Sequence, residues 1–396
     1  MKQDKKLGVI FVVILFVGFL GVVFNFSLLV LKVKEEVRDN YGVYQNKEEV
    51  NMLVKIENKL GNIVMAVENK VTNSFPFYAS INTFCQKLNY DINKLFYQDV
   101  PLKKNSDDEY VFYNQRDNFY YIKNKYSDNE LSKRLDKQVT FFNELSKKGV
   151  DVYLYVPTRY ELTVLPKNNL NSYVQEFTNK LDKDIRVRVM DVQNVQDYQR
   201  YFYKTDHHWN IYGALNGYED IMDMLGKEPL NDLKVTVHKE RKYYGSMAKT
   251  ALNDQTFDYI LDVTKENTCD VSVNGGKALK EFKPRYIRLD RAQKFYDYYV
   301  QYFNGQYGNV VYKCANDSQD KLLIMSDSYA WQIDYLVADS FSETHVINLR
   351  YDEYKDKKFD IMGYMKKNEI SKVLFLYEGG STIFDQYDYD FYGRLK

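Results

Sequence analysis

KLLIMSDSYA, at residues 321–330, joins a short apolar run to a polar turn that contains two serines. An apolar run of this length is typical of a buried strand, and the turn after it would present Ser328 at the edge of a sheet. Further strand-like segments occur at 150–157, 186–191, 344–348 and 372–377, with helix-like spacing in several intervening segments. Because strands that alternate with helices form parallel sheets, the sequence predicts an α/β fold with a mainly parallel sheet flanked by helices.

A second segment, KTDHHWN at 204–210, places two of the four histidines beside a carboxylate. A serine hydroxyl is a poor nucleophile until a base takes its proton, and a histidine does this best when an aspartate orients it. Residues i and i+2 of an extended segment face the same side, so Asp206 and His208 can hydrogen-bond, whereas we expect His207 to point elsewhere. Ser328, His208 and Asp206 are therefore the candidate nucleophile, base and orienting carboxylate.

Two further side chains are candidate contacts for the substrate or for an oxyanion. Tyr329 follows Ser328 directly, and Arg350 follows the apolar run at 344–348. A positive charge, or backbone N–H groups at a helix start near Ser328, would stabilise developing negative charge. Arg350 can equally be a structural salt-bridge residue.

The same residues are also compatible with structural or metal-binding roles. A serine after a strand can cap a helix, and Ser326 is a competing nucleophile with Asp327 a candidate cap. Asp-His-His can ligate a divalent ion, but a metal phosphoesterase would need more aspartates at strand ends. The one late pair, Asp388-Tyr-Asp390, lies in a tyrosine-rich tail. We therefore expect no metal and no cofactor.

Composition narrows the class of protein. The chain has 396 residues, 45% of them hydrophobic, which is enough for one large or two modest domains. Lys+Arg and Asp+Glu both count 55, and this balance argues against a nucleic-acid partner. Three cysteines without CxxC spacing argue against zinc-ribbon and thioredoxin-type sites and leave at most one disulfide, which we expect between Cys269 and Cys314.

Residues 7–31 are apolar except for glycines, Asn25 and Ser27. At about 1.5 Å per residue this segment spans roughly 37 Å, which is enough to cross a bilayer core. A cleaved signal peptide would have a shorter apolar region and a cleavage site of small residues. Three lysines precede the span and predict a cytoplasmic amino terminus, although Lys32 and Lys34 on the far flank weaken that orientation. The expectation is a single-pass protein of the cell membrane.

Three regions follow from these patterns. Residues 1–33 are expected to form a cytoplasmic tip and transmembrane anchor, and residues 34–130 a helical stalk and irregular cap. Residues 131–396 are expected to form the extracytoplasmic catalytic domain, with a β-rich insertion on the rim of the sheet at about 235–315.

The motifs resemble those of a known family. KTDHHW at 204–209 with Gly213 one helical turn later, DSYA at 327–330 and NLRYD at 348–352 are similar to the bacterial DHHW protein family. The resemblance covers roughly residues 130–380. It implies an SGNH-hydrolase-like domain related to the alginate O-acetyltransferases, with Asp206 as orienting residue, His208 as base and Ser328 as nucleophile. Such relatives are extracytoplasmic and work beside a membrane-bound O-acyltransferase.

These observations predict a membrane-anchored, extracytoplasmic serine O-acetyltransferase or acetylesterase. The expected substrate is an exopolysaccharide or cell-wall glycan, with the membrane and a membrane-bound O-acyltransferase as partners and no nucleic acid. The alternative is a non-catalytic protein of cell-envelope assembly or glycan binding, in which the same three residues are structural.

Overall fold

The computed structural model divides the chain into two units, Met1–Asn89 and Tyr90–Lys396. The residues it describes all belong to the second unit: 99–104, 110–114, 118–122, 127–158, 170–192, 194–231, 233–251, 254, 256–265, 269–273, 277–278, 299, 307–351, 354, 359–385 and 387–395. The expected anchor at 7–31 lies outside them, as does the expected stalk and cap at 34–130 except for 99–104, 110–114, 118–122 and 127–130. Within the described ranges, no helix is both long and apolar enough to cross a membrane.

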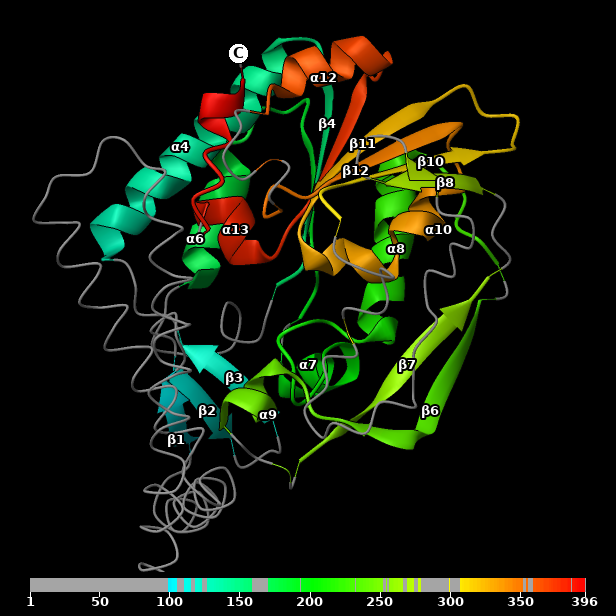
Figure 1. Cartoon of the computed structure of the whole chain (residues 1–396). Coiled ribbons are helices and arrows are strands. Elements are labelled where there is room, and N and C mark those ends of the chain that lie inside the picture. Colours follow the sequence, from blue (N-terminus) through cyan, green and yellow to red (C-terminus); the bar gives the residue numbers. More distant parts are fainter. Residues whose placement is uncertain are drawn as a thin grey trace, which may run out of the picture. The chain divides into compact units, whose positions relative to one another are not determined.

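An eight-stranded sheet forms the centre of this unit (Figure 1). Its strand order is β5 (Arg186–Val189), β4 (Asp151–Val156), β13 (Lys372–Leu376), β11 (Lys321–Ser326), β12 (Glu343–Ile347), β10 (Asn309–Cys314), β8 (Cys269–Val273) and β9 (Lys277–Ala278). The first five strands are parallel, and the last three continue the sheet in antiparallel pairs. The predicted α/β fold with a mostly parallel sheet is confirmed.

Helices cover both faces of the sheet because its central strands are apolar on both sides. On one face α4 (Asp128–Lys147), α6 (Leu170–Lys180), α12 (Ile361–Asn368) and α13 (Gly379–Phe384) share a core with Leu323, Met325 and Phe375. On the other face α7 (Val195–Tyr201), α8 (Ile211–Leu225) and α10 (Asp334–Ala338) share a core with Tyr155 and Ile324. Alternate residues of β11 thus enter opposite cores, as a strand's period of two requires.

Helix α8 anchors the histidine segment to this second core. Asn210 caps its first turn by accepting from the N–H groups of Tyr212 and Gly213, and Gly226 ends it with a φ of 66°. Trp209, which immediately precedes the cap, is fully buried. Gly217 permits this packing, since a Cβ there would lie 2.7 Å from Cζ3 of Trp209.

The segment expected as one insertion at about 235–315 is divided in the structure. Its first part forms a two-stranded ribbon, β6 (Lys234–Tyr243) with β7 (Asp258–Thr264), and the short helix α9 (Ser246–Ala251). Its second part supplies β8, β9 and β10 of the main sheet, because these strands find free backbone partners at the edge beyond β12. Cys269 and Cys314 are cross-strand partners and form the expected disulfide.

Two smaller elements complete the described part. β1 (Asp99–Lys104), β2 (Tyr110–Asn114) and β3 (Asn118–Ile122) form an antiparallel sheet next to α9. The 3-10 helix η2 (Ser328–Gln332) follows β11, and the 3-10 helix η3 (Tyr392–Arg394) lies in the tyrosine-rich tail.

Candidate active site

The histidine segment forms a tight loop between α7 and α8. Phe202 and Trp209 pair as an antiparallel bridge, and the Asn210 amide donates to the carbonyl of Phe202, so the chain between them is forced to turn. The indole N–H of Trp209 donates to the carbonyl of Tyr329 at 3.1 Å. This contact ties the loop to the turn after β11.

That turn presents Ser328. Asp327 caps η2 by accepting from the N–H of Tyr329 at 2.9 Å, and its second oxygen accepts from the N–H of Glu378 at 3.0 Å. The expected cap is therefore confirmed. Ser326 is buried, and no described residue hydrogen-bonds to its hydroxyl. Of the two serines in this turn, Ser328 is the one that reaches a histidine.

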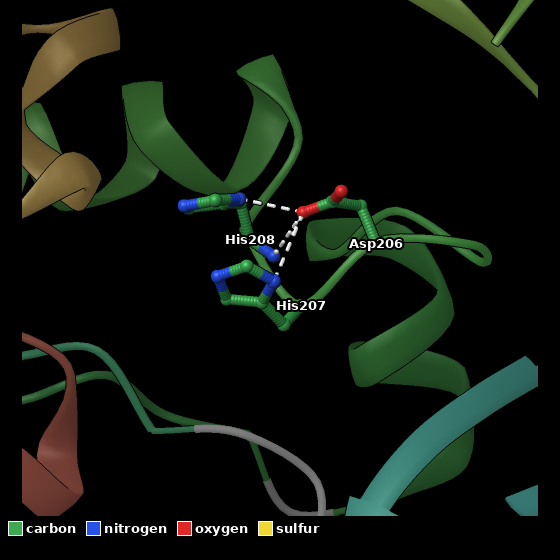
Figure 2. A group of neighbouring side chains, drawn as sticks. All are labelled: Asp206, His207 and His208. Atoms are coloured by element: carbon green, nitrogen blue, oxygen red, sulfur yellow. Dashed lines mark hydrogen bonds and ion pairs between the residues drawn. The ribbon is translucent and has the colours of Figure 1, made fainter. Parts of the chain in front are cut away.

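The three residues selected from the sequence lie in one hydrogen-bonded line. Nε2 of His208 is 2.7 Å from Oγ of Ser328, and Nδ1 of His208 is 2.5 Å from Oδ1 of Asp206. All three side chains are buried. Because an ionised carboxylate can only accept, Nδ1 carries the proton and Nε2 is left to accept the proton of the serine. Figure 2 shows the imidazole of His208 directed at Asp206.

Asp206 is held by donors from outside its own loop. Its Oδ2 accepts from the hydroxyl of Tyr243 at 2.8 Å and from the N–H of Ser246 at 2.7 Å. Burial alone would raise the pKa of Asp206, but the charges of His208 and His207 and the hydrogen bonds from His208 and from the N–H of Ser246 outweigh it and lower the pKa. The carboxylate therefore stays ionised, as an orienting group must.

His207 does not point away from this centre, so that expectation was wrong. Its Nδ1 is 2.8 Å from Oγ of Ser246 and 3.4 Å from Oδ1 of Asp206, and its ring lies 3.9 Å from that of His208 (Figure 2). The i, i+2 argument assumed an extended strand, whereas this loop is a succession of bends that turns both imidazoles toward one carboxylate.

The ribbon β6–β7 supports the start of the histidine loop, at Lys204 and Thr205. Asp258, the first residue of β7, accepts from the N–H and hydroxyl of Thr205 at 2.8 and 2.6 Å and from the N–H of Lys204 at 3.0 Å. Its register partner is Tyr243, which bonds Asp206. Gly245 lets the chain pass close by, since a Cβ there would lie 2.4 Å from Cβ of Asp206. Sequence reasoning missed Tyr243, Ser246 and Asp258, because no local pattern marks a contact to a loop that lies 37 to 54 residues away in the chain.

Tyr299 was not among the expected site residues either. Its ring stacks on the imidazole of His208 with centroids 3.7 Å apart and planes at 11°. Its hydroxyl donates to the backbone carbonyl of Ser328 at 3.1 Å. The chain has many tyrosines, and nothing in the sequence distinguishes Tyr299 from the tyrosines near it.

The two expected oxyanion or substrate contacts have other partners in the described part of the chain. Tyr329 donates its hydroxyl to the carbonyl of His207 at 2.5 Å and so braces the loop. Arg350 donates to the hydroxyl of Tyr389 at 2.8 Å and lies 4.3 Å from the ring centroid of Tyr387. Burial alone would lower the pKa of Arg350, but Tyr389, Asp327 and Tyr387 raise it.

Asp206, His207 and His208 also offer ligand atoms within 4.8 Å of one another. Their donor atoms are already committed, since His208 uses one nitrogen for Asp206 and the other for Ser328. The two aspartates of the tail form salt bridges with basic side chains, Asp388 with Arg134 and Asp390 with Lys137. The geometry thus favours a proton relay over a metal centre.

Part of this site lies in a region that matches a known protein family. Residues 106–281 match the family model described as the SGNH hydrolase-like domain of the acetyltransferase AlgX, a range that includes Asp206 and His208. No curated protein matches the sequence significantly.

Two solved structures share the fold. PatB1 from Bacillus cereus, determined with a sulfonyl adduct, is 22% identical, with 72% of this chain and 99% of that chain covered and a TM-score of 0.57. A DHHW family protein from Eubacterium siraeum is 19% identical, with 74% and 96% covered and a TM-score of 0.54. The resemblance read from the motifs is confirmed: over residues 106–281 this chain is similar to the SGNH hydrolase-like domain of the acetyltransferase AlgX, and it shares its fold with PatB1 and with a DHHW family protein.

Proposed function

We propose that this protein is a serine O-acetyltransferase that works through Ser328, His208 and Asp206. The observation that supports this is the unbroken line of short contacts, 2.7 Å from serine to histidine and 2.5 Å from histidine to aspartate. Such a line activates a hydroxyl at neutral pH, because the imidazolium that forms is stabilised by the carboxylate behind it.

Transfer proceeds in two steps of the same form. Oγ of Ser328 attacks the acetyl carbonyl of the donor while Nε2 of His208 takes its proton, and the leaving group departs with that proton. A hydroxyl of the acceptor then attacks the acetyl-serine, again losing its proton to Nε2, and Ser328 leaves and recovers the proton. The backbone N–H of Ser328 is the donor to the oxyanion in both steps, since the N–H of Tyr329 is bonded to Asp327 and the described contacts of Arg350 lie elsewhere.

The proposed acceptor is a sugar hydroxyl of an exopolysaccharide or cell-wall glycan outside the cytoplasm. The Cys269–Cys314 disulfide supports that location, because disulfides persist in oxidising compartments. The apolar segment at 7–31 would hold the enzyme to the cell membrane, where a membrane-bound O-acyltransferase would supply acetyl groups. Water in place of the sugar makes the same relay an acetylesterase.

The first experiment compares the 396-residue chain with two serine variants on an activated acetyl ester. Ser328→Ala should lose nearly all turnover, because removing one relay member removes the contribution of the whole relay. Ser326→Ala is the matched control, since this serine lies two residues earlier and does not contact His208, and it should retain activity.

Covalent labelling gives a second readout that needs no substrate. The PatB1 structure carries a sulfonyl adduct, and a sulfonyl fluoride should likewise modify Ser328 here, detected by peptide mass spectrometry. Equal turnover and labelling in parent and Ser328→Ala would refute the proposal. A folded parent that neither turns over nor labels would favour the glycan-binding alternative.

A further inference from the structure

Tyr299 contacts both reacting residues of the site, the side chain of His208 and the backbone of Ser328, from outside their own loops. Its ring covers one face of His208 at 3.7 Å, nearly parallel, while its hydroxyl bonds the backbone of Ser328 at 3.1 Å. It is 1% exposed, and the indole of Trp331 lies against it with centroids 6.0 Å apart. A side chain so enclosed has one position available, so the imidazole beneath it has little freedom to tilt.

The position of the Tyr299 ring matters because His208 changes its charge during the reaction. His208 becomes an imidazolium whenever it holds the proton of Ser328 or of the acceptor. The face of a phenol ring carries negative charge density and attracts a cation placed over it. In a buried, water-poor site this attraction is stronger than at a surface, and it acts only on the protonated form of His208.

We propose that Tyr299 is a positioning residue for His208: its ring holds the imidazole in the plane of the relay and stabilises the imidazolium, and its hydroxyl fixes the backbone of the nucleophile. This rests on the proposed function of Ser328 and His208 and adds a residue that the motifs do not contain. The ring and the hydroxyl have separable roles, and two substitutions separate them.

Tyr299→Phe keeps the stacked ring and removes the bond to the Ser328 carbonyl. Tyr299→Leu keeps an apolar cover of similar reach, so that water stays excluded, but removes the aromatic face. From the usual strength of a cation–π contact, kcat/KM should be about 2- to 30-fold lower in Tyr299→Leu than in Tyr299→Phe. The titration midpoint of His208 should be lower by about 0.4 to 1.5 pH units in the same comparison.

Other groups in contact with His208 are the same in both variants, so they cancel in the comparison. Within the described part of the chain the titratable ones are Asp206 and His207 from its own loop and Tyr329, whose ring centroid is 5.4 Å away. The difference between Phe and Leu therefore reports the ring of residue 299 alone.

The test uses the 396-residue chain in detergent with histidine labelled selectively for NMR. Four histidines give four imidazole signals, and His208 is assigned by the signal missing from His208→Gln. The midpoint of His208 should be lower in Tyr299→Leu than in Tyr299→Phe, and the acid limb of kcat/KM should move with it, since that limb follows the base of the free enzyme. Equal midpoints in the two variants would overturn the inference even if both are active.

A failure of the proposed acetyl-transfer function would give a different result from a failure of the proposed role of Tyr299. A parent without turnover or sulfonyl labelling would refute the acetyl-transfer proposal while the NMR comparison still decides whether the ring stabilises protonated His208. If Tyr299→Leu does not fold, Tyr299→Met replaces it as the non-aromatic cover in the same comparison with Tyr299→Phe. A loss of more than about 30-fold in Phe would show that the hydroxyl, and not the stack, carries the effect.

Discussion

Tyr243→Phe removes one donor from the carboxylate that orients His208. The hydroxyl of Tyr243 lies 2.8 Å from Oδ2 of Asp206, and both side chains are buried. A hydrogen bond to a buried charged group contributes about 1.5–3 kcal/mol, so the variant should lose that much unfolding free energy at pH 7. The bond from His208 to Oδ1 survives, and kcat/KM should therefore fall by less than about tenfold.

The loss should depend on pH with a defined sign. Folding lowers the pKa of Asp206: burial opposes this, and the neighbouring His208 and His207 outweigh it. Such a carboxyl stabilises the folded state above its unfolded pKa, near about 3.9, and this contribution is lost as pH falls through the folded pKa. Removing a donor to the ionised form raises the folded pKa, so the difference between parent and variant should be full at about pH 6–7 and shrink below about pH 4.

Urea unfolding followed by tryptophan fluorescence measures this directly, because both tryptophans, Trp209 and Trp331, are buried near the site. Tyr312→Phe is the matched control. Its hydroxyl bonds the buried carboxylate of Asp334 at 3.0 Å, so it should lose comparable stability without any change in the pH profile of activity. An unchanged midpoint at pH 7 for Tyr243→Phe, or a difference that grows toward low pH, would refute the reasoning.

Three further changes test other parts of the structure. Burial raises the pKa of Asp258 to about 6 despite its bonds from Thr205 and Lys204, so its ionisation penalises the folded state as pH rises from about 4 through 6. Asp258→Asn lacks this penalty and should gain about 1–3 kcal/mol relative to the parent between about pH 4 and pH 7 in urea titrations. Reducing the disulfide frees a segment with a sequence separation of 45 residues and should cost about 4 kcal/mol, measured as a shift of the urea midpoint with reductant. Gly245→Ala should abolish sulfonyl labelling of the active serine, because the new Cβ would lie 2.6 Å from Oδ2 of Asp206 and displace it. A stability difference between Asp258→Asn and the parent that does not change with pH would contradict the first expectation. A urea midpoint that does not move under reductant would contradict the second, and normal sulfonyl labelling of Gly245→Ala would contradict the third.

The elements that local pattern could predict were predicted well. The apolar runs at 150–157, 321–325 and 372–377 correspond to β4, β11 and β13, which are buried on both faces and therefore read as continuous hydrophobic segments. Helix α8 begins after an asparagine cap and ends at a glycine, which are residues that commonly mark helix termini. Strands β8 and β10 were harder to place, because a short strand-like segment carries no signal for the strand with which it pairs.

The same division holds within the site. Asp206 and His208 are neighbours in sequence, and Ser328 stands in a recognisable strand-to-turn segment, so residue chemistry alone selected them. The orientation of His207 could not be read, because it depends on bends imposed by contacts with Ser246 and Asp206. Arg350 was selected for its charge, but its position is decided by Tyr387 and Tyr389 from the tail.

What the sequence by itself determined is the fold class and the identity of the reactive groups, since hydrophobic periodicity and scarce titratable residues are properties of short segments. Only the tertiary structure decided how those groups are held. Tyr243 bonds Asp206 across 37 residues of the chain, Asp258 bonds Thr205 across 53, and Tyr299 bonds Ser328 across 29. Their bonds exist because folding brings separate elements within about 3 Å, and hydrogen bonds act only over such distances.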